Sequence, residues 1–174
     1  MSINYDKFPT YMASSSAFTP GATPQDVFSI TGNATTNVYV LRMGISTLQT
    51  TEGLNAWYVA KRSTANSGGT SANVTEVALQ SGQPAAGATV LQYTANPTAG
   101  TLVGNVWTGF VDAADAAITA VGSQQVVIDF ETALGQPIAL LSASEVLAWN
   151  FGGAALPTGL SVLAWVLWAE SSKT

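Results

Sequence analysis

Apolar and polar residues alternate with a period of two along most of the chain after residue 26. The clearest example is residues 125–131, where Val126, Ile128 and Phe130 fall on one side and polar residues dominate the other. Because successive side chains of a strand point to opposite faces, this period predicts β-strands. Such runs occupy 37–48, 56–61, 89–93, 102–111, 125–131, 138–141, 145–151 and 160–170, with shorter runs at 27–30 and 77–79.

Gly, Pro, Asn and Ser interrupt these runs at short intervals, as at Gly82-Gln-Pro84 and Gly135-Gln-Pro137. Many short strands separated by turn residues are typical of an antiparallel sandwich or barrel. We therefore expect an all-β chain, an antiparallel β-sandwich of about eight strands that occupies residues 26–174. Residues 63–74 are small and polar and predict a loop. Residues 112–121 are rich in alanine and fit either a loop or one helical turn.

Residues 1–25 lack this alternation and predict an extended N-terminal arm. The segment combines several prolines and serines with four aromatic side chains, Tyr5, Phe8, Tyr11 and Phe18. Disordered tails are usually poor in aromatic residues, so an arm that lies along its own domain or along a neighbouring subunit explains the composition better. These four residues are the candidate contacts of the arm with its own domain or with a neighbouring subunit.

The two last strands are apolar on both faces. Leu147, Trp149 and Phe151 lie opposite Val146 and Ala148 on the first of them. On the second, Leu163, Trp165 and Leu167 lie opposite Val162, Ala164, Val166 and Trp168. A sandwich strand normally buries one face and exposes the other to water.

Three explanations remain open for the second apolar face. In the first, a loop or the arm of the same chain covers this face. In the second, the strands are internal on both sides. In the third, another subunit packs on the face. We favour the third, and Leu147, Trp149, Phe151, Leu163, Trp165 and Leu167 are the candidate subunit interface.

Composition supports assembly. Charged residues make up 9% of the chain and hydrophobic residues 47%, with a net charge of −5. An average globular chain has about 25% charged residues. Because charge normally keeps an exposed surface soluble, so little of it indicates that partner chains cover part of this surface.

Candidate catalytic chemistry is sparse. The chain contains no Cys and no His, which excludes thiolate chemistry, disulfides and imidazole bases or ligands. Asp129 and Glu131 share a predicted strand face at a spacing that an inverting glycosidase could use, but an alternating strand exposes polar residues by default. Asp112 and Asp115 lack the surrounding oxygen ligands of a calcium loop. We expect no enzymatic activity, no cofactor and no metal.

Neither nucleic acid nor a membrane is an expected partner. The five basic residues form no cluster larger than Lys61-Arg62, whereas non-specific nucleic-acid binding requires several neutralised phosphates. No apolar run reaches the roughly 18 residues of a spanning helix, and no secretory signal is visible. The expected site of synthesis is a cytoplasm.

Residues 135–140 (GQPIAL) and 145–165 (EVLAWNFGGAALPTGLSVLAW) resemble small virion structural proteins of tailed bacteriophages. The segments VLRMGI (40–45), LNAWY (54–58) and KRSTAN (61–66) add to this resemblance, which spans about residues 27–170. It implies a jelly-roll-like fold and a decoration, or cement, protein on the capsid exterior that is made in the host cytoplasm. The resemblance also makes Tyr5, Phe8, Tyr11 and Phe18 the candidate contacts of the arm with the capsid.

The expected function is therefore a non-enzymatic virion protein that forms a homo-oligomer, expected to be a trimer, and stabilises the shell by binding the major capsid protein. The alternative is a tail or fibre component whose loops bind a host glycan.

Overall fold

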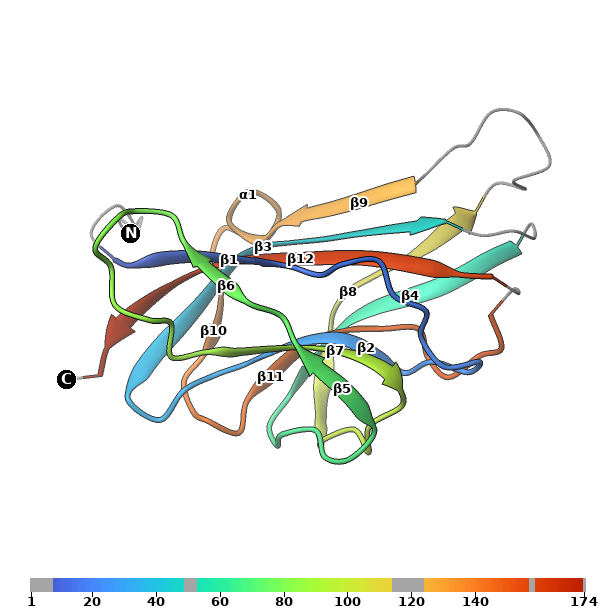
Figure 1. The fold of residues 1–174 in the computed structure, drawn as a ribbon, viewed down its shortest axis with the longest axis horizontal. Helices are drawn as coiled ribbons and strands as arrows, with labels where there is room; N and C mark the ends of the chain where they lie inside the picture. The colour runs from blue at the N-terminus through green and yellow to red at the C-terminus, as the bar shows by residue number, and fades with distance from the viewer. Residues whose placement is uncertain (1–7, 49–52, 114–123, 157–158, 174) are drawn as a thin grey trace.

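The computed structural model describes residues 8–48, 53–113, 124–156 and 159–173 (Figure 1). Within these residues the chain is nearly all β, with two antiparallel sheets packed face to face, so the predicted sandwich is confirmed. Twelve strands are present in the described part of the chain rather than about eight. The predicted 112–121 segment lies mostly outside the described residues, and the structure does not decide between a loop and a helical turn there.

Sheet A has the strand order β10-β3-β12-β1-β6, and β9 pairs with β3 beside β10. Its longest strand, β3, pairs with β10 through Val38–Val40 and with β9 through Arg42–Thr47. Figure 1 shows this sheet with β9 and α1 along one edge. The strands are β1 (Thr10–Ser14), β3 (Thr36–Leu48), β6 (Glu76–Ala78), β9 (Gln124–Asp129), β10 (Ile138–Leu140) and β12 (Ser161–Ser172).

Sheet B has the order β5-β7-β2-β11-β4-β8. Its central strand, β11, pairs with β2 on one side and with β4 on the other. The strands are β2 (Asp26–Thr31), β4 (Gly53–Arg62), β5 (Thr70–Asn73), β7 (Thr89–Ala95), β8 (Leu102–Ala113) and β11 (Val146–Asn150).

The core lies between the sheets and is built from one face of each. Sheet A contributes Val38, Val40, Met43, Ile45, Val162, Val166 and Trp168, and sheet B contributes Phe28, Ile30, Trp57, Val59, Leu147 and Trp149. The indoles of Trp57 and Trp149 meet edge to face at 4.8 Å, a favoured aromatic geometry. In these strands about every second residue therefore lies in the core between the sheets, as the alternation in the sequence predicts.

Part of the predicted N-terminal arm is a strand of the sandwich. Residues 10–14 form β1, which pairs along its length with β12 and, on its other side, with β6. Further on, the backbone of Phe18 pairs with Val162. The expected boundary at residue 26 therefore does not separate an arm from the domain.

The predicted strand 125–131 ends two residues early, at Asp129. Helix α1 (Phe130–Leu134) follows, and its first turn is capped by the Asp129 carboxylate, which accepts a 3.0 Å hydrogen bond from the Thr132 amide. Gly135 ends the helix in the left-handed region at φ 74°, where glycine carries no steric penalty. The short helix returns the chain to β3, so that β9 and β10 share one edge of it.

Candidate functional site

The six predicted interface residues separate into two groups of three. Leu147 and Trp149 lie on the inward face of β11, a central strand of sheet B, and Phe151 follows this strand directly. All three are almost completely buried in the core. They belong to the core of this chain and present no surface to a partner. The other three, Leu163, Trp165 and Leu167, lie on the outward face of β12 and are exposed or half-buried.

The second apolar face of β11 is covered by the chain itself. Val146 and Ala148 are fully buried although they point away from the core. The segment that carries Asn66 and the segment that carries Gly100 meet over this outward face, and the Gly100 amide donates a 2.9 Å hydrogen bond to Asn66 Oδ1. For β11, the first of the three sequence explanations holds.

A buried ion pair holds the segments around Asn66 and Gly100 in place over this face. The Arg62 guanidinium donates two hydrogen bonds to the Asp26 carboxylate, at 2.7 and 2.6 Å. The same carboxylate accepts from Asn66 Nδ2 at 2.8 Å and from Asn150 Nδ2 at 2.6 Å. Arg62 also donates to the Gly100 carbonyl at 3.0 Å. Both charges are therefore paired and hydrogen-bonded, as buried charges must be.

In the part of the chain that the structure describes, the outward face of sheet A is only partly covered. Register alignment places Met12 of β1 beside Leu167 of β12 and Val77 of β6, and Val127 of β9 lies across Gly44 from Trp165. Val77, Val127 and Leu163 are 61%, 51% and 47% exposed. We call this surface, formed by Met12, Val77, Val127, Leu163, Trp165 and Leu167, the outer apolar face.

Trp165 lies flat on the sheet at the centre of this face. Its partner in β3 is Gly44, and a Cβ atom at that position would overlap the indole ring. A glycine in a long central strand costs stability and is otherwise unexpected. Here it provides the space that lets a large aromatic ring lie on the outward side of sheet A, half-buried.

One ion pair borders the outer apolar face. Among the outward-facing residues of the described strands of sheet A, the charged side chains are Arg42 and Asp129, which lie 2.7 Å apart. The amide of Thr132 and the Arg42 guanidinium together hold the pKa of Asp129 below its ordinary value, against a smaller opposing effect of burial. The Asp129 carboxylate therefore both caps the N-terminus of α1 and forms an exposed ion pair with Arg42.

This placement also separates the proposed glycosidase pair. Asp129 is the cap of α1, whereas Glu131 lies in its exposed first turn, so the two residues do not share a strand face. Asp112 and Asp115 have no described side chains. Among the described residues, no group of three or more Asp, Glu, His or Cys could hold a metal ion.

The described aromatic residues of the predicted arm pack on their own chain. Phe8 stacks on Tyr39 with ring centroids 6.4 Å apart. Tyr11 is buried against Trp168 at 5.6 Å, and its hydroxyl donates to the Pro84 carbonyl at 3.0 Å. Phe18 is also buried, and Tyr5 lies outside the described residues. Tyr11 and Phe18 are therefore core residues of this chain.

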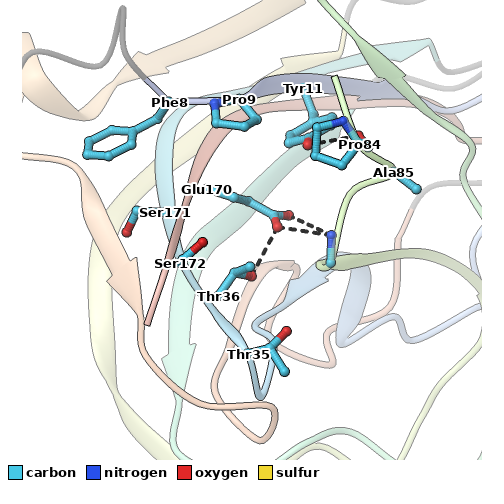
Figure 2. Close-up of a pocket in the computed structure, with 11 residues that line it drawn as sticks. Phe8, Pro9, Tyr11, Thr35, Thr36, Pro84, Ala85, Glu170, Ser171 and Ser172 are labelled. Carbon is cyan, nitrogen blue, oxygen red and sulfur yellow. Dashed lines mark hydrogen bonds between the residues drawn. The ribbon is translucent and has the colours of Figure 1, made fainter. Parts of the chain in front are cut away.

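A pocket of about 560 Å³ opens beside β1 and the C-terminal end of β12 (Figure 2). Glu170 is its charged residue and is almost completely buried. Its carboxylate accepts hydrogen bonds from the amides of Gly87 and Ala88 at 2.9 Å, from the Thr36 hydroxyl at 3.0 Å and from the Trp168 indole at 2.9 Å. Burial, with a contribution from Glu170, raises the pKa of Tyr11 on the pocket wall.

These four donors occupy the acceptor positions of the Glu170 carboxylate. The residue joins the 87–88 segment to the end of β12 through these hydrogen bonds. Glu170 is thus a structural contact in the wall of the pocket.

No helix among the described residues is both long and apolar enough to cross a membrane.

The sequence did not predict the Asp26–Arg62 pair, since neither residue stands in a motif and only the fold brings them together. A close contact at Gly44, the glycine beneath Trp165, could have been predicted, because this glycine interrupts an otherwise well-formed strand pattern.

Comparisons with family descriptions, with curated proteins and with solved structures find no match to this chain.

Proposed function

We propose that this chain is a non-enzymatic virion structural protein that self-associates and attaches to a phage capsid as a decoration protein. The observation that carries the assembly part is the outer apolar face of sheet A. It spans four strands, contains an exposed or half-buried Trp and two Leu, and is bordered by one ion pair. Apolar surface of this kind on a soluble protein marks an interaction site.

Burial of these side chains would supply the driving force. A Val or Leu side chain gains about 1.5–3 kcal/mol when it passes from full exposure to full burial. Val77, Val127 and Leu163 are each about half exposed. Each would therefore gain the remaining part of this burial free energy when a partner covers it. Trp165 adds a large, rigid ring of the type that is enriched at the centre of interfaces.

The attachment to a capsid rests on the resemblance of residues 135–140 and 145–165 to phage virion proteins and on the low charge of the chain. A homo-oligomer, expected to be a trimer, would repeat each weak contact with the major capsid protein. Repetition raises the total affinity without new contacts, which suits a protein that reinforces a shell.

The experiment compares two leucines of similar exposure. Leu163 is 47% exposed on the outer apolar face, and Leu141 is 54% exposed after β10, away from it. Leu163→Lys should lower the oligomer mass in light scattering and reduce co-sedimentation with empty capsids of the phage. Leu141→Lys should change neither. A wild-type protein that stays monomeric and does not sediment with capsids would contradict the proposal.

A further inference from the structure

Strand β1 fills a groove between two other strands of sheet A. It pairs with β12 along its whole length and with β6 on its other side, and Figure 1 shows it in blue beside the red β12. Tyr11 and Ala13 point inward and are almost completely buried, and the Tyr11 ring stacks on Trp168. Without β1, the facing edges of β12 and β6 would be unpaired. The groove between them therefore requires a strand.

One connection attaches β1 to the sandwich. No described strand precedes β1, so it is linked to the other described strands through residues 15–25 alone. A strand with a single attachment can leave its groove and enter the same groove of another copy without passing through a loop. Because strand and groove are identical in every copy, such an exchange keeps all the contacts of β1.

The connection contains a short hinge. On one side of it, Phe18 pairs with Val162 of β12. On the other side, the Ala22 carbonyl accepts a hydrogen bond from the Leu156 amide at 3.2 Å. The residues between these two anchors, 19–21 (Thr-Pro-Gly), line a hollow of about 360 Å³ that leaves them room to move. The proline restricts the preceding threonine to extended conformations, and short hinges of this kind favour exchange between copies.

Strand β1 also belongs to the outer apolar face. Met12 lies on its outward side, between Leu167 of β12 and Val77 of β6. Two copies that associate through this face bring β1 of one copy close to the groove of the other. This proximity raises the effective concentration of β1 at the neighbouring groove, which favours the β1 of another copy over an unrelated strand.

We infer that residues 10–18 are exchanged between copies of this chain, so that β1 of one copy lies between β12 and β6 of its neighbour. The inference rests on the proposed function, because the outer apolar face brings the copies together, and it deepens that function by naming the segment that links them. Reciprocal exchange closes a dimer, and cyclic exchange closes a trimer. In both assemblies Tyr11 and Phe18 complete the core of the neighbouring copy.

The pair of Ala13 and Glu76 can report this exchange. They lie opposite each other in the pairing of β1 with β6. The Leu79 amide donates to the Thr10 carbonyl, and hydrogen-bonded and non-hydrogen-bonded pairs alternate along an antiparallel ladder, so Ala13 and Glu76 form a non-hydrogen-bonded pair. Side chains of such a pair are close enough for a disulfide. Ala13 is only 1% exposed, so a thiol there cannot reach another copy through surface contact.

The double variant Ala13→Cys with Glu76→Cys tests the inference. The chain contains no Cys, so the two new thiols have no competitors. The variant is refolded at high concentration, oxidised and separated on a non-reducing gel. Exchange predicts chains joined to one another by disulfides, whereas closed copies carry the disulfide within each chain. Disulfides only within chains would overturn the inference, and so would the absence of any disulfide, because the exchanged strand keeps the same register.

Mixtures of single variants supply the matched control. Copies with Ala13→Cys and copies with Glu76→Cys, unfolded and refolded together, should form a disulfide-linked dimer. Copies with Ala13→Cys and copies with Val77→Cys should not, because Val77 is the next residue of β6 and points outward. Circular dichroism and the melting temperature should show an intact fold for each variant. Equal yields of linked dimer from the two mixtures would overturn the inference.

The inference and the proposed function can fail separately. If Leu163→Lys lowers the oligomer mass while the oxidised double variant is linked only within chains, the exchange is overturned and the proposed assembly stands. If chains are linked to one another but wild-type protein does not sediment with capsids, the exchange stands and the capsid role fails.

Discussion

The outward faces of the two sheets are both apolar in sequence but have different surroundings. On sheet B, Val146 and Ala148 are buried beneath segments of the same chain, which a buried ion pair between Asp26 and Arg62 fixes in place. On sheet A, Leu163 and Trp165 remain at the surface, and the ion pair of Arg42 with Asp129 is partly exposed. An apolar outward face thus becomes either buried or exposed, depending on whether the chain supplies its own cover.

The two ion pairs make this difference measurable. Both join an Arg of a long strand to an Asp, at 2.6 Å on sheet B and 2.7 Å on sheet A. Their side-chain exposures are 7% and 0% in the first pair and 53% and 27% in the second. Burial, not distance, sets what each contributes to stability.

The largest effect is expected for Arg62→Ala. Removal of the guanidinium leaves the buried Asp26 carboxylate without its counter-charge, which should lower the free energy of unfolding by about 3–5 kcal/mol. Urea unfolding measures this loss. The double variant Arg62→Leu with Asp26→Asn removes both charges and should recover part of it; no recovery would show that packing, rather than charge, dominates at this site.

A smaller effect is expected for Gly44→Ala. The added methyl group overlaps the Trp165 indole and must lift it from sheet A, at a cost of about 1–3 kcal/mol. Gly104→Ala is the control, because a Cβ there meets no atom within 4 Å. Equal unfolding midpoints for the two variants would contradict the close packing of the Trp165 indole against Gly44.

Asp129→Ala should cost about 1 kcal/mol through loss of the cap of α1. The pKa of Asp129 is lowered in the folded protein, so its stabilisation is present above the ordinary value of 3.8. It is lost as the pH falls through the lowered folded value. The difference in unfolding free energy between wild type and variant should therefore shrink in acid, and a difference that grows below pH 3.8 would contradict the lowered pKa.

The smallest effect is expected for Arg42→Ala, at below about 1 kcal/mol, because solvent screens an exposed pair. Added salt should reduce it further. A loss as large as that of Arg62→Ala would mean that sheet A is covered as completely as sheet B, which would remove the contrast between the two faces.

The sequence predicted the all-β sandwich because alternation reports directly on which side of a strand meets the core. It could not distinguish Leu147 from Leu163, since both lie in strands that are apolar on two faces. Leu147 lies on the inward face of β11, whereas Leu163 lies on the outward face of β12, and the sequence pattern does not indicate which face of each strand meets the core. Likewise, the apolar residues near Tyr11 indicated packing of some kind but not a strand of the sheet.

The pairing of β1 with β12 sets the order in which the molecule can fold. Thr10 lies opposite Ala169, so β1 can join sheet A only after β12 has been synthesised. The edge of β3 that pairs with β12 also remains open until then. Contacts so distant in sequence slow folding and prolong the time in which strand edges are exposed. The outer apolar face, which includes Leu163 and Trp165 of β12, therefore forms only after these distant segments have paired.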